Sequence, residues 1–308
     1  MPSVSDGPRI ALAPAGPRGW LADAIVDGGG VLTGADEADG VVWASTGRAD
    51  DLADLLSTHP GIRWVQLPWA GIEPFAGVLD AAHVWTCGKG VYAEPVAEHA
   101  LMLALAGLRG LGHYARATSW EDQRGTNLLG APVTVVGGGG IASSLLRLLG
   151  PFGTEVTVVR HRPRPMDGAA RVVGPDALHS VLPDATLVVL ALPVLPETVG
   201  LIGRAELDLM APHAWLVNVA RGVHVVTDEL VSALEAGSIG GAALDVTDPE
   251  PLPGGHPLWA LPNCLVTPHT ANTEAMARPL LAARITANVR RFSAGEPLIG
   301  LVDAALGY

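Results

Sequence analysis

Three chemically reactive residues follow three successive apolar runs in the second half of the sequence. Arg221 comes after the run 214–219, and Glu250 and His269 come after the next two runs. Because ligands of open α/β sheets bind beyond the carboxyl ends of the strands, we expect these side chains to gather at one sheet edge. Such a set suits reduction of a 2-oxo acid: Arg221 holds the substrate carboxylate, His269 protonates the forming alkoxide, and Glu250 holds and charges the imidazole.

Each of the three residues alone also fits an ordinary structural role. Arg221 suits a surface ion pair, Glu250 a solvated loop acid and His269 a strand-capping histidine. Only their joint arrangement, next to a loop that can bind a dinucleotide, favours the chemical interpretation.

That loop is the glycine-rich stretch in TVVGGGGIASSLL, between an apolar run and a helical pattern. Gly137 permits a tight turn, Gly139 lets the backbone approach a pyrophosphate, and Ala142 allows close packing of helix on strand. Gly140 and Ile141 stand at the helix N-terminus, whose free N–H groups suit a phosphate. The stretch predicts a dinucleotide site, against the alternative of a flexible turn without a ligand.

A basic cluster, RHRPR, follows the second strand of the same domain. An enzyme that uses NAD usually places an acidic residue there, on the ribose 2′-hydroxyl. Here Arg160 occupies the position, with His161 and Arg162 beside it, and guanidinium groups suit a 2′-phosphate. We therefore expect NADP(H) as cofactor rather than NAD(H), unless the cluster is only a solvated surface loop.

Short runs rich in Val, Ile and Leu alternate with helical patterns along the chain, which indicates an α/β fold with parallel sheets covered on both faces. The stretch 95–108 is expected to form a buried helix that links two domains. Helical spacing also runs from Met276 to Phe292, and the tail PLIGLVD is expected to return to the first domain. The expected strands are 9–12, 41–43, 63–67, 83–86, 132–136, 155–159, 186–191, 214–219, 240–244 and 264–267.

Composition narrows the class of protein. A length of 308 residues suggests two domains with a cleft between them. The formal net charge of -12 makes nucleic acid an unexpected partner. Cys87 and Cys264 have no metal-type spacing, so we expect no metal site and two buried thiols. No uncharged apolar stretch has the length of a membrane span, and the start of the chain lacks a signal-peptide pattern, so the cytoplasm is the expected location.

Several motifs together resemble the D-isomer-specific 2-hydroxyacid dehydrogenase family. The resemblance covers nearly the whole chain, through GGGGIA, LALPVLPETVGLIG, NVARG, ALDVTDPEPLP and TPHTAN. It implies two doubly wound parallel-sheet domains, in which a larger Rossmann dinucleotide-binding domain is inserted into a flavodoxin-like catalytic domain formed by both ends of the chain. The expected boundaries are 1–92 and 291–308 for the catalytic domain and 93–290 for the dinucleotide-binding domain.

The resemblance also implies roles for individual residues. It gives substrate binding to Arg221, pairing with histidine to Glu250 and acid/base chemistry to His269. It places Asp245 near the nicotinamide carboxamide. Further residues implied at the cofactor are Leu192 and Pro193 beside the adenosine, and Val219 and Ala220 along the dinucleotide. Backbone N–H groups of Trp69, Ala70 and Gly71 correspond to a loop that holds the substrate carboxylate. The bulky Trp69 is a departure, whose indole fits narrowing of the pocket, contact with an apolar substrate tail or a core role.

These observations predict an NADP(H)-preferring oxidoreductase for a small 2-oxo or 2-hydroxy acid, without selecting among glyoxylate, hydroxypyruvate, pyruvate and bulkier acids. The resemblance implies a homodimer, in which the segment 110–128, with Trp120, embraces the partner. The alternative is a dinucleotide-sensing binding protein like the corepressors of the family, against which the complete Arg221, Glu250 and His269 set argues. Formate oxidation is disfavoured because Glu250 stands where that branch is expected to have glutamine.

Overall fold

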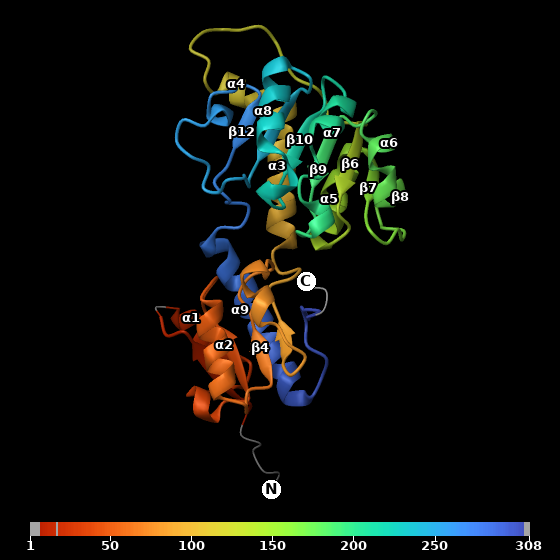
Figure 1. Cartoon of the computed structure of the whole chain (residues 1–308). Coiled ribbons are helices and arrows are strands. Elements are labelled where there is room, and N and C mark those ends of the chain that lie inside the picture. The colour runs from red at the N-terminus through yellow and green to blue at the C-terminus, as the bar shows by residue number, and fades with distance from the viewer. Residues whose placement is uncertain (1–6, 17, 305–308) are drawn as a thin grey trace. The chain divides into compact units, whose positions relative to one another are not determined.

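The computed structural model describes residues 7–16 and 18–304, which divide into two compact units (Figure 1). Unit 1 comprises Met1–Tyr92 and Thr273–Tyr308, and unit 2 comprises Ala93–Asn272. The chain therefore enters unit 2 from unit 1 and returns to unit 1 afterwards. In Figure 1, the red-to-orange segment and the blue segment after unit 2 together make unit 1.

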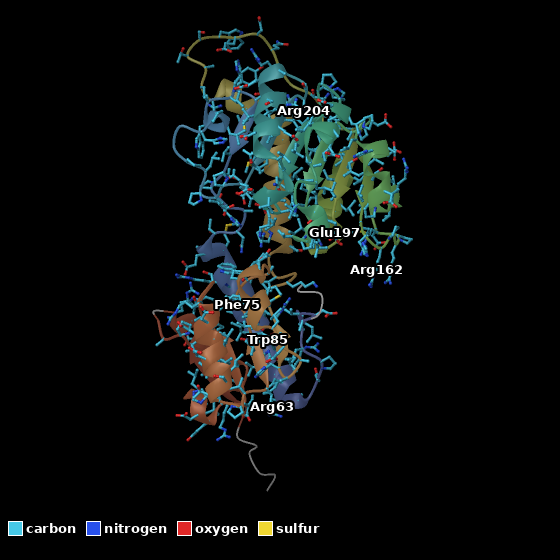
Figure 2. All side chains as sticks on the ribbon, viewed as in Figure 1. Arg63, Phe75, Trp85, Arg162, Glu197 and Arg204 are labelled. Carbon is cyan, nitrogen blue, oxygen red and sulfur yellow. The ribbon has the colours of Figure 1, made fainter. Side chains whose placement is uncertain are left out.

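Unit 1 contains a five-stranded parallel sheet with the strand order β2-β1-β3-β4-β5. This is the flavodoxin-like order, as the sequence led us to expect. Phe75 and Trp85, both labelled in Figure 2, are buried in its core. The elements are β1 (Arg9–Ala13), α1 (Gly19–Asp27), β2 (Val31–Thr33), β3 (Gly40–Trp43), α2 (Ala49–Thr58), β4 (Trp64–Gln66), β5 (Val84–Thr86) and α9 (Glu274–Ala294).

Helix α9 belongs to unit 1, which corrects the second expected boundary. The change of domain was expected at 291, near the end of this helix, whereas the two compact units divide between Asn272 and Thr273. The buried Asn288 explains why, because its Nδ2 donates to Gln66 Oε1 in β4 at 2.9 Å. Thr286 Oγ1 also donates to the carbonyl oxygen of Ala24 in α1 at 2.9 Å. These polar contacts attach the helix to β4 and α1 of unit 1.

Unit 2 contains a seven-stranded parallel sheet with the order β12-β11-β10-β9-β6-β7-β8. Its first six strands in chain order follow the Rossmann arrangement, in which the strand order reverses beside the first strand, here β6. The strands are β6 (Pro132–Val136), β7 (Glu155–Val159), β8 (Arg171–Val173), β9 (Leu187–Leu190), β10 (Trp215–Asn218), β11 (Gly241–Leu244) and β12 (Cys264–Val266).

Helices cover both faces of this sheet (Figure 1). One face packs into a cluster that includes Leu207 of α7 and Leu230 of α8. The other packs into a cluster that includes Leu103 of α3 and Leu145 of α5. The helices are α3 (Ala93–Leu108), α4 (Leu111–Tyr114), α5 (Gly140–Leu149), α6 (Leu178–Val181), α7 (Arg204–Leu209) and α8 (Thr227–Ala236).

Burial on both faces makes the central strands continuous apolar runs, which is why their positions could be predicted. Two edge strands, β2 and β8, were not expected from the sequence. Between residues 7 and 304, leaving out 17, we find no helix whose length and apolar character would let it span a bilayer.

Candidate active site at the carboxyl edge of the unit 2 sheet

The glycine turn joins β6 to α5 and has the backbone shape that the motif predicts. Gly137 has φ +120°, and a Cβ on it would lie 2.0 Å from the carbonyl oxygen of Ala191. Only glycine fits this left-handed, close approach. A Cβ on Gly139 would meet no atom within 4 Å, so the space beside it is open. Helix α5 begins at Gly140, followed by Ile141 and the buried Ala142. The turn thus leaves room for a phosphate at a helix N-terminus.

Arg160 follows β7 and lies over this turn. A Cβ built on Gly138 would be 2.6 Å from Arg160 Nε, so the guanidinium end of the side chain packs against the glycine stretch. His161 and Arg162 are exposed, and Figure 2 shows the Arg162 side chain extending away from the ribbon. The cluster thus has one member at the turn and the others toward solvent.

The loop after β9 carries Leu192 and Pro193 and is closed by Thr198. The Thr198 hydroxyl accepts a hydrogen bond from the Leu195 amide at 2.8 Å and lies 3.0 Å from the Pro193 carbonyl oxygen. These local bonds fix the shape of a loop next to the glycine turn, because β9 and β6 are neighbouring strands.

Arg221 lies in a turn after β10 that Asn218 organises. The buried Asn218 accepts from the Ala220 amide at 3.0 Å and donates from Nδ2 to the Arg221 carbonyl oxygen at 2.8 Å. Val219 and Ala220 are buried, and Arg221 itself is half-buried. One guanidinium nitrogen, Nη1, donates to the Ala220 carbonyl oxygen at 2.7 Å. The turn therefore holds the base of the Arg221 side chain in place.

His269 and Glu250 form a direct pair. His269 Nδ1 lies 2.6 Å from Glu250 Oε1, and the two side chains are 51% and 41% exposed, so solvent or a ligand can reach them. His269 also has φ +52°, a left-handed conformation that is uncommon for a residue with a side chain. Such backbone strain persists only where neighbouring contacts hold it.

Asp245 supplies those contacts. Its carboxylate accepts hydrogen bonds from the Thr267 hydroxyl at 2.6 Å, the Thr270 amide at 2.8 Å and the Ala271 amide at 3.0 Å. The Asp245 carbonyl oxygen accepts from the His269 amide at 2.8 Å. Burial alone raises the pKa of Asp245, but hydrogen bonds, from His99 and Thr267 first, hold that pKa below its usual value. Asp245 is therefore an ionised anchor for the His269 turn.

Sequence reasoning missed two members of this anchor, His99 and Thr267. His99 Nε2 lies 3.0 Å from Thr267 Oγ1 and 3.2 Å from Asp245 Oδ1, so α3 is tied to the turn after β12. Thr267 could have been noticed because it directly precedes the Pro-His pair. His99 carries no such signal, because it lies in an apolar helix far from the motif in sequence.

The three residues expected to react follow β10, β11 and β12, which are consecutive strands in the sheet. The structure joins His269 and Glu250 directly and brings Arg221 to the same edge from the neighbouring strand. The glycine turn stands at this edge too, after β6. A cation, a carboxylate–imidazole pair and the open space beside Gly139 thus share one edge of the sheet.

Trp69, Ala70 and Gly71 lie in unit 1, in the loop after β4. The Trp69 ring packs against Tyr92 with 5.3 Å between ring centroids, and the side chain is only half-buried, so it stacks on a neighbour rather than filling the core. Tyr92 donates from its hydroxyl to the Pro68 carbonyl oxygen at 2.8 Å, and burial raises the pKa of Tyr92. The Trp69 carbonyl oxygen accepts from the Gly88 amide at 2.9 Å, so the loop is braced from two sides.

Comparisons with known proteins agree with this architecture. The chain is 37% identical over 293 residues to an uncharacterized protein in the proB 3′ region of Corynebacterium melassecola, covering 92% of this chain and 95% of that protein. It is 33% identical over 271 residues to glyoxylate/hydroxypyruvate reductase A of Escherichia fergusonii, covering 87% and 81% of the two chains. A D-isomer specific 2-hydroxyacid dehydrogenase from Xanthobacter autotrophicus Py2, solved with NADPH and MES, is 27% identical with a TM-score of 0.85 and covers 99% of this chain and 100% of its own.

Residues 99–271 match the model of the D-isomer specific 2-hydroxyacid dehydrogenase NAD binding domain. This stretch contains the glycine turn, Arg221, Glu250 and most of unit 2, including His269. The resemblance seen in the sequence motifs is thereby confirmed. The chain belongs to the D-isomer specific 2-hydroxyacid dehydrogenase family.

Proposed function

We propose that this protein reduces a small 2-oxo acid to the 2-hydroxy acid with NADPH as the hydride donor. The contact that carries the proposal is His269 Nδ1 to Glu250 Oε1, at 2.6 Å. It joins an acid/base group to a carboxylate at the sheet edge that also holds Arg221 and the glycine turn. Support also comes from the relatives whose names describe glyoxylate/hydroxypyruvate reductases and from the related dehydrogenase solved with NADPH.

The residues at the glycine turn suit the dinucleotide. The opening at Gly139 and the free N–H groups of α5 fit a pyrophosphate. Gly137, Gly140 and Ile141 shape this cradle. The adenosine is assigned to Leu192 and Pro193, and the rest of the dinucleotide to Val219, Ala220 and Asp245. When bound, NADPH supplies the hydride that adds to the 2-carbon of the substrate.

His269 is proposed as the proton donor. Its Nδ1 is engaged by Glu250, so Nε2 is the nitrogen that donates the proton to the oxygen on the 2-carbon. The carboxylate of Glu250 fixes the orientation of the ring and stabilises the imidazolium form. Because the pair is half-exposed, His269 can recover a proton from solvent after each turnover.

Arg221 is proposed to bind the substrate carboxylate. A guanidinium can donate two parallel hydrogen bonds to a carboxylate, which orients the 2-oxo group as well as attracting it. The Asn218 bonds to the Arg221 turn reduce the freedom that binding has to remove. On the family resemblance, the backbone N–H groups of Trp69, Ala70 and Gly71 are assigned to the same carboxylate.

The preference for NADPH is proposed from Arg160. Its side chain lies against Gly138 of the phosphate turn, where an enzyme that prefers NAD carries an acidic group for the ribose hydroxyls. Arg160, with His161 and Arg162, offers donors to the 2′-phosphate, which NADH lacks. NADH is therefore expected to be the poorer cofactor.

The protein is proposed to act as a homodimer in the cytoplasm. The segment 110–128 carries Trp120, whose side chain is 100% exposed, and Leu111, which is also exposed. Such apolar exposure favours a partner surface. Cys87 and Cys264 are free, buried thiols, as a reducing compartment favours. Light scattering on the purified protein gives the mass in solution, and a monomer at micromolar concentration would refute the dimer.

A dinucleotide-sensing protein without turnover is the rival function. It requires the dinucleotide site but not the acid/base pair. Here His269, on its strained and braced turn, is held in contact with Glu250 from the loop after β11. Formate oxidation is disfavoured by Glu250 itself, since glutamine is expected in that branch. The arrangement therefore favours turnover of an oxo acid over either rival.

The test is a turnover assay on the purified protein with a panel of acids. Glyoxylate, hydroxypyruvate, pyruvate and one bulkier 2-oxo acid are each offered with NADPH and with NADH, and cofactor oxidation is followed by absorbance. We expect oxidation with at least one acid and a higher kcat/KM for NADPH. Tight NADPH binding without turnover of any acid would instead support the sensing protein.

A further inference from the structure

His224 is a fully buried histidine of unit 2 that none of the roles above uses. It ends the short 3-10 turn Gly222–His224 directly after Arg221. Its Nδ1 lies 2.8 Å from the carbonyl oxygen of Thr198, and its Nε2 lies 3.3 Å from the carbonyl oxygen of Leu192. A carbonyl oxygen only accepts hydrogen bonds, so the ring must donate. The shorter contact assigns a proton to Nδ1.

Both carbonyl groups belong to the loop after β9. That loop begins at Leu192 and is closed by the Thr198 hydroxyl. His224 therefore contacts its two ends at once, across the boundary between two strand-end loops. Main-chain bonds join the same segments, since the Ile202 amide donates to the His224 carbonyl oxygen at 2.9 Å and the Gly200 amide donates to that of Val223 at 2.8 Å.

The main chain of His224 contacts the turn of Arg221, the cation that is proposed to bind the substrate carboxylate. The His224 amide donates to the Arg221 carbonyl oxygen at 3.3 Å, and the same oxygen accepts from Asn218 Nδ2 at 2.8 Å. The Arg221 carbonyl oxygen is thus held by Asn218 of β10 and by the His224 amide of the same turn, while the His224 ring contacts the loop after β9. A shift of the imidazole would move both segments.

We propose that His224 is a positioning residue that couples the adenosine side of the cofactor site to the Arg221 turn. The proposal rests on the proposed function, because Leu192 and Arg221 take their roles from it. His224 touches neither cofactor nor substrate. It fixes the distance between the loop that lies along the dinucleotide and the turn that binds the oxo acid.

The imidazole is needed for this task because the site is buried. A leucine of similar size would fill the space but leave the Thr198 carbonyl oxygen without the Nδ1–H donor and remove the contact to the Leu192 carbonyl oxygen, which costs free energy. The loop would relieve that cost by moving toward water. A merely structural histidine would lower stability when replaced, whereas a positioning residue also changes ligand affinity in the folded variant.

Three substitutions separate the two ring contacts. His224→Asn keeps a donor near the position of Nδ1, His224→Gln keeps one near that of Nε2, and His224→Leu keeps neither. Since one lost hydrogen bond corresponds to up to about tenfold in affinity, His224→Leu is expected to raise the Kd for NADPH and the KM for the oxo acid by about tenfold each. His224→Asn, which keeps the shorter contact, should restore most of both, and kcat should change least.

The measurements are NADPH titration by fluorescence, steady-state kinetics, thermal melting, and hydrogen exchange at the Gly200 and Ile202 amides. His213→Leu, which removes an exposed histidine before β10, is the matched control. Faster exchange and weaker NADPH binding in His224→Leu, rescued in His224→Asn, would support the proposal. If His224→Leu does not fold, the comparison of the Asn and Gln variants decides.

Two results would overturn the proposal. One is unchanged Kd and KM in folded variants whose melting temperature alone falls. The other is a ring-nitrogen NMR signal in the wild-type protein showing Nδ1 without a proton. Failure of the proposed function looks different: the wild-type protein would then neither bind NADPH nor reduce any acid. In that case hydrogen exchange would still report whether His224 holds the loop after β9. The proposed coupling between the cofactor site and the Arg221 turn would be rejected together with the proposed function.

Discussion

The turn around His269 and the basic loop after β7 lie at the same edge of the unit 2 sheet but are built differently. The His269 turn has a strained backbone, with φ +52°, and four hydrogen bonds from its residues or from Thr267 end on Asp245. In the basic loop, Arg160 packs against Gly138, while His161, Arg162 and Arg164 are exposed. One region is fixed by a buried anion, and the other is mostly solvated.

The difference follows from what each region has to do. Proton transfer requires the donor within hydrogen-bond reach of one substrate atom, so position matters on the scale of an ångström. Attraction of a 2′-phosphate by several cations acts over a longer distance, about 10 Å at ordinary ionic strength, and tolerates flexible side chains. Hydrogen bonds therefore fix the His269 turn, where the reaction depends on exact geometry. Exposed arginines suffice in the basic loop, where recognition depends on charge.

The largest expected effect comes from removing the imidazole. His269→Ala should lose about a hundredfold or more in kcat, the scale of general-acid catalysis, while the Kd for NADPH stays near the wild-type value. His179→Ala is a matched control, because His179 also pairs with a glutamate, Glu206, at 2.7 Å but lies in α6. Turnover of the His269 variant within a few-fold of wild type would remove the mechanism.

Arg221→Lys should follow in size. Lysine keeps the charge but cannot give the planar pair of donors, so kcat/KM for the oxo acid should fall roughly tenfold to a hundredfold. NADPH affinity should be spared. Arg204→Lys, an exposed arginine at the start of α7 (Figure 2), serves as control and should leave both values unchanged. Selective weakening of NADPH binding in the Arg221 variant would contradict its assignment to the substrate.

Asp245→Asn tests the anchor of the His269 turn. An amide cannot accept every bond that the carboxylate accepts, so unfolding free energy should fall by about 1–3 kcal/mol at neutral pH, with a loss of kcat. The pKa of Asp245 in the folded protein lies below the ordinary value of an aspartate, so its ionised form stabilises the fold fully above that ordinary pKa. This contribution disappears as pH falls through the lower, folded-state pKa.

Urea unfolding over a range of pH checks this sign. The difference in unfolding free energy between wild type and Asp245→Asn should be constant above about pH 5. It should shrink only below the pKa that Asp245 has in the unfolded chain. A difference that already shrinks between pH 5 and pH 7 would mean that another group carries the effect.

Arg160→Asp should have the smallest effect of the four and tests the solvated side of the comparison. It removes a donor for the 2′-phosphate, so NADPH should bind about tenfold more weakly while NADH improves modestly. Arg164→Asp changes the same loop by the same charge, farther along the chain. Equal losses from both substitutions would show that only the general charge of the loop matters. Equal use of NADH and NADPH by the wild-type protein would show that the loop is solvated surface without a role in cofactor choice.

The sheets could be predicted where burial makes a strand a continuous apolar run, as in β6, β9 and β10. The missed strands β2 (Val31–Thr33) and β8 (Arg171–Val173) are three-residue edge strands. An edge strand pairs with a neighbouring strand on one side only, and β8 begins with an exposed arginine. Neither β2 nor β8 therefore gives a clear hydrophobic pattern in the sequence. The expected boundary at 291, inside α9, differs from the division at 272/273 because helical periodicity does not say which sheet a helix packs on.

The candidate site shows a similar limit. Strand ends and motifs located Arg221, Glu250 and His269, because the chemistry of these residue types is visible in the sequence. His99 and His224 were not found, since each acts through a contact with a residue distant in the chain. The anchoring bonds of Asp245 were also hidden, although the residue itself was singled out. Supporting contacts depend on packing, which no local pattern records.

Unit 1 is built from two segments of the chain that are separated by unit 2, so its two parts are synthesised at different times. Residues 7–92 leave the ribosome before unit 2, but α9, which packs on their sheet, follows all of unit 2. Until Asn288 emerges, the buried Gln66 lacks its partner on that helix, and the bridge between Thr86 and Leu301 is also missing. At usual translation rates, the interval between residue 92 and the end of α9 is roughly 10 to 40 s. Unit 2 has all of its residues during the last part of that interval, so unit 2 can complete its fold before unit 1 has all of its residues.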